Sequence, residues 1–309
     1  MSPIEIVCSD LNAAIERWRG DGFLLDLIYP ADNPHTAVLA NGARKVRLTT
    51  RPAAAGPSAA LPSFRPEFVL TRGEIPVGEG RAGMLYRDLI PSRLGGRYIA
   101  SHITIAQGGP VADWVHFHRV AFQIIYVRSG WVRVVYEDQG EPFVMNAGDL
   151  VLQPPEIRHR VLESSPGLEV IEISCPALHE TCADHELRLP NGLNLARIFG
   201  GQRFLRHIAA ETEWTGFHDG EAQETGVGDA AGGLAEARTV RGGVRLPPHE
   251  GELVFGFVLA GSAQLGFRDG FDLGPADAFV IPPGEAWSLS GASNDFRLLH
   301  VTTDRAKSA

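Results

Sequence analysis

The sequence predicts a mainly β protein, with two β-rich blocks behind a small α+β N-terminal module. From about residue 81 to 175, and again from about 228 to 301, short runs of β-branched and aromatic residues are broken by Gly, Pro and Asp. Such runs are typical of an antiparallel sandwich or barrel. The two blocks also resemble each other, as copies of a duplicated domain would.

The N-terminal module covers residues 1–50. Apolar residues recur at helical spacing over 11–19, and the segments 23–30, 35–40 and 43–50 have the composition of strands separated by turns. The expected order is strand, helix and three strands. Residues 51–66 are rich in Pro, Ala, Gly and Ser, which predicts a linker.

The internal repeat gives the remaining domain boundaries. Residues 128–161 can be laid on the stretch that begins at residue 259, so that Gly130 matches Gly261 and Pro154-Pro155 matches Pro282-Pro283. We therefore expect a first barrel over 67–190 and a second over 191–309.

Composition and charge argue against some classes of binding partner and indicate a cellular compartment. The formal net charge is −9 and no basic block occurs, which argues against nucleic acid and anionic membranes as partners. The apolar runs are of strand length, and the first ten residues do not resemble a signal peptide. Three cysteines without a framework of spacings fit a reducing compartment, so we expect a cytoplasmic protein.

A pair of histidines in the first block predicts a metal site. His116 and His118 are two residues apart, so both side chains lie on one face of a strand. Gln123 is an odd number of residues from either, so it converges with them only if the chain bends in between. His159 follows a Gly-Asp turn, an apolar strand and Pro-Pro, and it is the candidate for a further ligand.

These residues resemble the two motifs of the cupin superfamily. The first motif corresponds to Gly109–Gly130 and the second to Gly148–Ser164. The chain departs from the pattern at Gln123, where glutamate is usual, and at Glu156, where glycine is common; the final asparagine is not evident. The resemblance implies a jelly-roll barrel that binds one divalent metal through His116, His118, Gln123 and His159. The alternative for Gln123 is a hydrogen bond to a ligand.

The ligand set leaves the metal and the reaction open. Imidazole and carbonyl donors suit Fe, Mn, Ni, Co or Zn, and iron is weakly favoured. A neutral amide in place of a carboxylate leaves the ion its full charge, and so makes it a stronger Lewis acid. Some cupins that act on unsaturated uronates also use His, His, Gln and His, and that resemblance implies chemistry without redox change.

The strand before the first motif supplies weak catalytic candidates. Alternation places Tyr98, Ala100 and His102 on one face and Arg97, Ile99 and Ser101 on the other, and either set could line the barrel. Arg97 or His102 could anchor a substrate. The candidates for a catalytic group are Glu156, His102 and Tyr98.

The second barrel has lost most of the ligand positions. In the repeat alignment, His249 matches His118, but Pro247, Val254 and Trp287 match the other three candidates. A lone histidine holds a divalent ion poorly, so we expect a degenerate barrel with a structural role. One active and one degenerate barrel resembles several bicupin enzymes, including gentisate-type ring-cleaving dioxygenases. Those typically use three histidines, and Gln123 departs from that set.

The N-terminal order of strand, helix and three strands resembles one module of the glyoxalase/bleomycin-resistance superfamily. Those folds pair two modules, whereas this chain has one, without an evident His/Glu ligand pair. The expected role is packing or dimer formation, and a homodimer is also suggested by analogy with other bicupins.

The leading functional hypothesis is a metal-dependent non-haem dioxygenase acting on a small, oxygen-chelating substrate of aromatic or diketone type. The alternative is a non-redox isomerase or lyase acting on a sugar acid or keto acid. A third possibility is a small-molecule binding protein without turnover. Neither a basic patch nor a helix-turn-helix motif is evident in the sequence, which argues against a fused transcriptional regulator.

Overall fold

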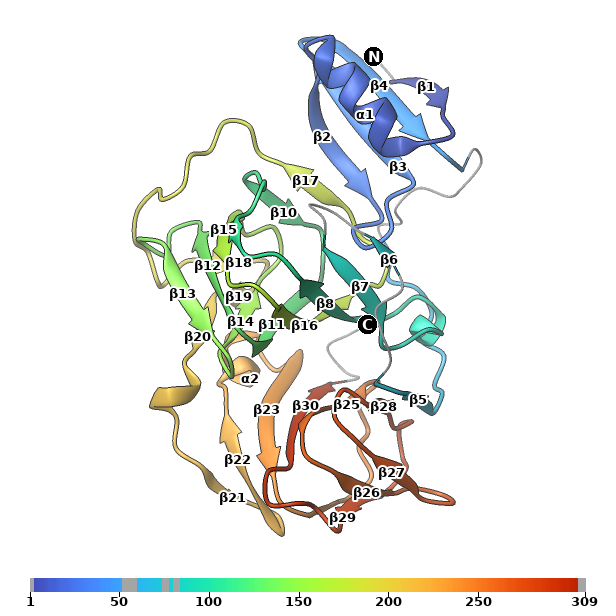
Figure 1. Cartoon of the computed structure of the whole chain (residues 1–309), viewed down its shortest axis with the longest axis vertical. Helices are drawn as coiled ribbons and strands as arrows, with labels where there is room; N and C mark the ends of the chain where they lie inside the picture. The colour runs from blue at the N-terminus through green and yellow to red at the C-terminus, as the bar shows by residue number, and fades with distance from the viewer. Residues whose placement is uncertain (1–2, 52–59, 74–77, 80–83, 305–309) are drawn as a thin grey trace.

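The computed structural model describes residues 3–51, 60–73, 78–79 and 84–304, and Figure 1 shows their arrangement. The N-terminal module lies at one end of the molecule and has the expected order of elements. Asp10 caps the helix, because its Oδ1 accepts a hydrogen bond from the Ala13 amide (3.0 Å). The elements are β1 (Ile4–Val7), α1 (Leu11–Gly20), β2 (Leu24–Tyr29), β3 (Thr36–Asn41) and β4 (Arg44–Thr49).

The N-terminal sheet does not end within the module. Its strand order is β1-β4-β3-β2, and β2 then pairs with β17 (Thr181–Ala183), which pairs in turn with β10 (His116–His118). The module is thus joined edge to edge to a sheet of the first barrel. Among the described residues, no helix has both the length and the apolar character needed to cross a membrane.

The first barrel consists of two facing sheets. One continues from β17 and β10, and its further strands are β15 (His159–Ser164), β12 (Trp131–Tyr136), β13 (Phe143–Asn146) and β9 (Gly109–Pro110). The other consists of β20 (Leu205–His207), β14 (Leu150–Gln153), β11 (Phe122–Ser129), β16 (Leu168–Cys175), β8 (Ile99–Ile105), β7 (Leu85–Asp88) and β6 (Gly78–Glu79). A separate pair is formed by β18 (Ile198–Phe199) and β19 (Gln202–Arg203), and a short 3-10 helix spans Arg93–Gly95.

The second barrel repeats this arrangement. Its larger sheet consists of β21 (Thr215–Phe217), β22 (Gly220–Glu224), β23 (Ala235–Arg241), β30 (Arg297–Thr303), β25 (Val254–Ala260), β28 (Ala278–Val280) and β5 (Val69–Thr71). Its smaller sheet consists of β24 (Val244–Leu246), β29 (Trp287–Ser290), β26 (Ala263–Gly266) and β27 (Phe271–Leu273). Short helices lie at Ala209–Glu211 and at α2 (Val227–Ala230).

Equivalent glycines support the repeat alignment. Gly130 and Gly261 both have a left-handed backbone, with φ of 77° and 69°. In both barrels the amide of the next residue donates to a serine hydroxyl: Trp131 N to Ser165 Oγ (3.0 Å) and Ser262 N to Ser293 Oγ (2.9 Å). The two blocks therefore share a local structure as well as a pattern.

Two strands lie on the other side of the boundaries expected from the sequence. β5 falls within the range 67–190, yet it pairs with β28 of the second barrel. β20 falls within 191–309, yet it pairs with β14 of the first barrel. The barrels thus exchange edge strands. Strand pairing depends on which edge a segment reaches, and position along the chain does not reveal this.

The sheet of the first barrel that contains β11 and the larger sheet of the second barrel lie against each other (Figure 1), and residues of both form one shared core. Phe122, Ile124 and Tyr126 of β11 belong to this core together with Phe255 and Phe257 of β25. Because side chains alternate along a strand, the residues between them on β11 face the interior of the first barrel. The contact between the barrels therefore determines which side chains of β11 reach the candidate site.

Candidate metal centre

The structure brings three histidines together inside the first barrel. His116 and His159 are paired across β10 and β15, and His118 lies on the same face of β10. Each side chain offers one nitrogen, and these nitrogens all lie within 4.8 Å of one another. All three histidines are buried. Convergent buried imidazoles are a suitable donor set for a transition metal.

Hydrogen bonds hold two of the rings in the tautomer that a metal needs. His116 Nδ1 lies 2.7 Å from the carbonyl oxygen of Trp114, and His159 Nδ1 lies 3.0 Å from that of Ile157. A carbonyl oxygen only accepts, so each Nδ1 carries the proton and each Nε2 keeps its lone pair. Metal-binding histidines in proteins commonly have this arrangement.

The third histidine, His118, contacts a strand that also pairs with the N-terminal module. His118 Nδ1 lies 3.1 Å from the hydroxyl of Thr181 on β17. This strand pairs with β10, with His118 opposite Thr181, and on its other edge with β2. The N-terminal module therefore supports the strand that orients His118, a role that sequence reasoning had described only as packing or dimer formation.

Gln123 faces the same cavity as the histidines. Residues 119–121 separate β10 from β11, and this interruption carries the chain from one sheet to the other. Such a bend is needed for Gln123 to face the histidines, because side chains alternate along a strand. Gln123 is 1% exposed, and its Oε1 makes no hydrogen bond within the described part of the chain. A buried amide oxygen without a partner is costly, and a metal ion would satisfy it.

The rest of the cavity is mostly apolar. No Lys or Arg from the described residues lines it. Its aliphatic and thioether walls come from both sheets: Met84, Ile103, Ile105, Ile125, Val132, Val134, Met145, Val161, Leu168 and Val170. A charge placed in this cavity is therefore poorly solvated, and an ion bound by the histidines would act strongly on a substrate.

Four polar residues of the lining were missed by sequence reasoning. They are Tyr86, Tyr136, Gln153 and Glu172. The ring of Tyr136 stacks on that of His159 (centroids 5.4 Å apart), and burial raises its pKa, so the phenol stays protonated. Gln153 Nε2 donates to the Tyr136 hydroxyl (2.8 Å).

Glu172 is the one acidic residue among the described lining of the cavity. It lies on β16 with Val170, which shares its face and also lines the cavity. A carboxylate on the inward face of an otherwise apolar strand is the signal that the sequence offered. Glu172 is therefore the candidate acid–base group that lies in the same cavity as the histidines.

The three earlier catalytic candidates lie elsewhere. Tyr98 and His102 face the shared core between the barrels, where Tyr98 Oη donates to Glu252 (2.9 Å) and His102 Nε2 lies 2.6 Å from Glu169. Glu156 is exposed in the turn before β15, with φ of 59°. The opposite face of β8 lines the cavity through Ile103 and Ile105.

The suggested substrate anchor is engaged in the contact between the barrels. Arg97 forms a two-pronged pair with Glu252 through Nε–Oε2 (2.7 Å) and Nη2–Oε1 (2.9 Å). Neither Arg97 nor Glu252 lines the cavity. This pair contributes to holding the barrels together, and it leaves substrate binding to other residues.

With this geometry established, residues 101–173 match the sequence model of the cupin domain. Over these residues the first barrel is similar to a cupin domain. The matched segment contains both histidine motifs, Gln123 and Glu172. No curated protein sequence matches the chain.

Solved structures share the fold of this chain over most of its length. The E. coli protein Ylba is 13% identical, with a TM-score of 0.56 over 80% of this chain and 95% of that one. A putative glyoxylate-induced protein from Pseudomonas aeruginosa is 13% identical, with a TM-score of 0.56 over 82% of this chain and 94% of that one. The oxalate decarboxylase of Lactobacillus farciminis, solved as a formate complex, is 13% identical, with a TM-score of 0.52 over 81% of this chain and 88% of that one. At this identity the likeness shows the fold alone, and the mainly β jelly-roll prediction is confirmed.

Proposed function

We propose that this chain is a metal-dependent cupin enzyme whose first barrel binds a small substrate through two neighbouring oxygen atoms. One observation carries the proposal: three buried imidazoles and the unpartnered Oε1 of Gln123 face one cavity. His116, His118, Gln123 and His159 would hold the ion. A divalent ion there would supply a Lewis acid with positions open to a chelating substrate and, if it is iron, to dioxygen.

The lining indicates the kind of substrate. Aliphatic side chains cover most of the cavity, and none of its described lining residues is a cation that could pair with a carboxylate. The body of the substrate is therefore apolar, as in an aromatic diol or a diketone. A polyhydroxylated sugar acid would leave many polar groups without partners against these walls.

Glu172 supplies the proton transfer that such a substrate needs. A diol or an enolisable diketone chelates best after losing a proton, and the Glu172 carboxylate can accept it inside the same cavity. The Tyr136 hydroxyl, which accepts a hydrogen bond from Gln153, lies among the same lining residues. These groups would orient and deprotonate the substrate, and the apolar walls would exclude water.

For the reaction we propose a dioxygenase, with iron as the metal. A carbon–carbon bond of the substrate breaks and both atoms of dioxygen enter the products, so no further oxidant or reductant is required. An apolar cavity and a neutral ligand set suit an anionic chelate and a non-polar gas. The second candidate, a non-redox isomerase or lyase on a keto acid, is favoured by Glu172, because such reactions begin with proton abstraction next to a carbonyl.

The test combines metal content with oxygen uptake. Wild type and a variant carrying both His116→Ala and His159→Ala are purified without added metal and analysed for metal, then supplied with catechol-like and diketone substrates at an oxygen electrode. We expect about one iron per chain and substrate-dependent oxygen uptake in wild type, and neither in the variant. Glu172→Gln is the matched variant: it keeps size and hydrogen bonding, and we expect it to retain iron and lose uptake.

Other outcomes would redirect or overturn the proposal. Substrate conversion that is indifferent to oxygen, with several divalent ions active, would replace the dioxygenase by the non-redox enzyme. Ligand binding without any product would indicate a binding protein. Absence of metal in both proteins after reloading would contradict the metal site itself.

A further inference from the structure

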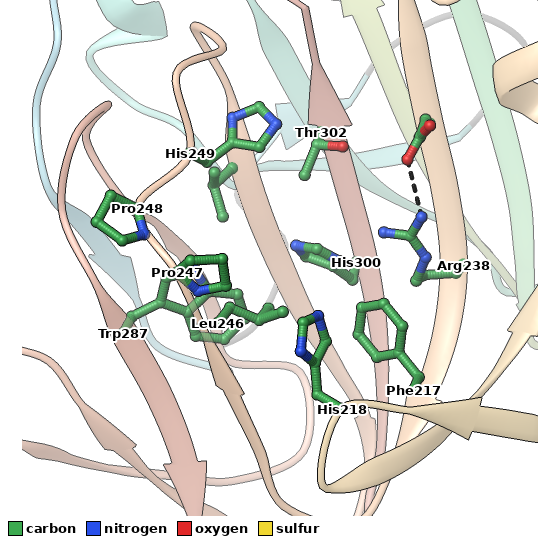
Figure 2. A pocket seen from close by; sticks show the side chains of 12 residues that line it. Phe217, His218, Arg238, Leu246, Pro247, Pro248, His249, Trp287, His300 and Thr302 are labelled. Atoms are coloured by element: carbon green, nitrogen blue, oxygen red, sulfur yellow. Dashed lines mark hydrogen bonds and ion pairs between the residues drawn. The ribbon is translucent and has the colours of Figure 1, made fainter.

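The second barrel contains a pocket of its own, shown in Figure 2. It lies in the place that the metal centre occupies in the first barrel, because the four residues aligned with the ligands all line it: Pro247, His249, Val254 and Trp287. Two further histidines, His218 and His300, surround the same space (Figure 2). Of these three histidines, the repeat alignment identified His249 alone.

Strand register shows which residue of the first barrel His300 replaces. Gln123 pairs with Ser174, and its counterpart Val254 pairs with Thr302. Two residues before Ser174, Glu172 pairs with Ile125. Two residues before Thr302, His300 pairs with Gly256. His300 therefore stands at the position of Glu172. The second barrel has lost ligand positions, but it has kept an ionisable side chain facing the interior.

His300 has unfulfilled hydrogen-bonding capacity. It is 4% exposed, and neither of its ring nitrogens makes a hydrogen bond within the described part of the chain. A buried imidazole always has one N–H to donate, and leaving it without an acceptor is unfavourable. A ligand in the pocket would supply that acceptor.

Other donors face the same space. His249 Nδ1 accepts a hydrogen bond from the Gly251 amide (2.9 Å), so its proton is on Nε2. Arg238 lies opposite His300 on β23 and binds Glu224 through Nε and Glu236 through Nη2, each at 2.8 Å. Those bonds do not use the two N–H groups of Nη1. The pocket is therefore rich in donors.

Glu236, which binds Arg238, also lines the pocket and offsets the charge of Arg238, so the unused N–H donors are what would select a ligand here. Burial, followed by the charges of Arg238, His249 and His218, lowers the pKa of His300 to about 3. Within the described residues, the grouping of His, Cys, Asp and Glu atoms close enough for a metal occurs at His116, His118 and His159 and not here. The walls are apolar and partly aromatic, with Phe217, Leu246 and Trp287.

We propose that this pocket is a second binding site, independent of metal, for a small carboxylate with a flat apolar body. The carboxylate oxygens would accept from His300, from His249 Nε2 and from Arg238 Nη1, and the body would lie against Trp287 and Phe217. The pair of barrels then has two ligand sites of different chemistry, a metal centre in the first and an anion pocket in the second.

Benzoate is the probe, titrated by calorimetry into the metal-loaded full chain, with benzamide as the uncharged counterpart of the same shape. We expect saturable binding of benzoate, at least about ten-fold weaker binding of benzamide, and at least about ten-fold weaker benzoate binding after His300→Ala. Arg238→Gln and His249→Ala are the second and third variants, in case the buried change disturbs folding. His116→Ala is the matched control in the other barrel and should leave benzoate affinity unchanged.

The results separate the two sites. Loss of benzoate binding in His116→Ala, with His300→Ala unaffected, would place benzoate at the metal centre and overturn the proposal. Equal affinities in all variants, or absence of binding in wild type, would do the same. A second equivalent of metal that is lost in His300→Ala would identify the pocket as a metal site and contradict an anion site.

Discussion

His116 and His159 lie directly opposite each other on antiparallel strands, with their ring centroids 4.2 Å apart. They are 43 positions apart in the chain. Because β10 has three residues and its register with β15 is set by this one pair, the candidate metal centre depends on a short piece of sheet. On its other edge β10 pairs with β17 over three residues, so β17 is part of what holds the site in shape.

The contact between Thr181 and His118 predicts that a substitution of Thr181 weakens metal binding. In Thr181→Val the hydroxyl next to His118 Nδ1 is lost while the shape is kept. We expect metal affinity to fall by roughly 10- to 100-fold, because outer partners orient the ligand ring. A competition titration with a chelator measures it. Thr104→Val, a strand threonine of the same barrel, is the control, and equal metal affinities for the two variants would refute the role of Thr181.

The two amides of the cavity should behave differently. Gln123 Oε1 and Gln153 Oε1 both lack a hydrogen bond among the described residues, and the two residues are paired across β11 and β14. Gln153 is anchored by its bond to Tyr136. If Gln123 is the ligand, Gln123→Ala loses at least about ten-fold in metal affinity, and Gln153→Ala loses much less. The reverse ranking would make Gln153 the ligand.

The pair Arg97–Glu252 predicts a large loss of stability. Both side chains are about nine-tenths buried, and Glu252 also accepts from the hydroxyl of Tyr98. Glu252→Ala leaves the Arg97 charge buried without its partner, so we expect the free energy of unfolding to fall by about 3–5 kcal/mol. Glu16→Ala breaks the exposed pair with Arg19 and should cost under about 1 kcal/mol. Denaturant unfolding compares them, and similar losses would contradict this account.

His300 predicts acid sensitivity. Its pKa is about 3 in the folded chain and near the ordinary value of 6.5 when unfolded, so only the unfolded chain binds the proton between these values. The contribution is fully present above about pH 6.5 and is lost as the pH falls toward 3, by about 1.4 kcal/mol per pH unit. His300→Leu should flatten this dependence, measured by denaturant unfolding from pH 7 to 4. Parallel curves for the two proteins would exclude His300 as the cause.

Several features followed from the chain alone because they depend on local spacing. Alternation placed His116 and His118 on one face, and the odd spacing required a bend before Gln123; the structure has that break at residues 119–121. The mainly β fold and the order of the N-terminal elements also followed from periodicity and turn residues. The resemblance of that module to glyoxalases, the homodimer and the cytoplasmic location stay predictions.

Other features could not be found by spacing. Either face of β8 could have lined the barrel, and packing against the second barrel decided it, which removed Tyr98 and His102 from the site and left Ile103 and Ile105 there. Glu172 and His300 lie on strands outside the motifs, and only the closure of each barrel brings them to the ligand positions.

The sequence by itself determined the fold class, the duplicated β blocks and the histidines of the candidate metal centre, because each is carried by side-chain alternation and turn residues within short motifs. Tertiary structure decided the exchange of β5 and β20, the acid–base candidate Glu172 and the pocket around His300. The reason is physical: strand edges and sheet faces are selected by burial against distant segments, and that competition is settled only when the whole chain packs.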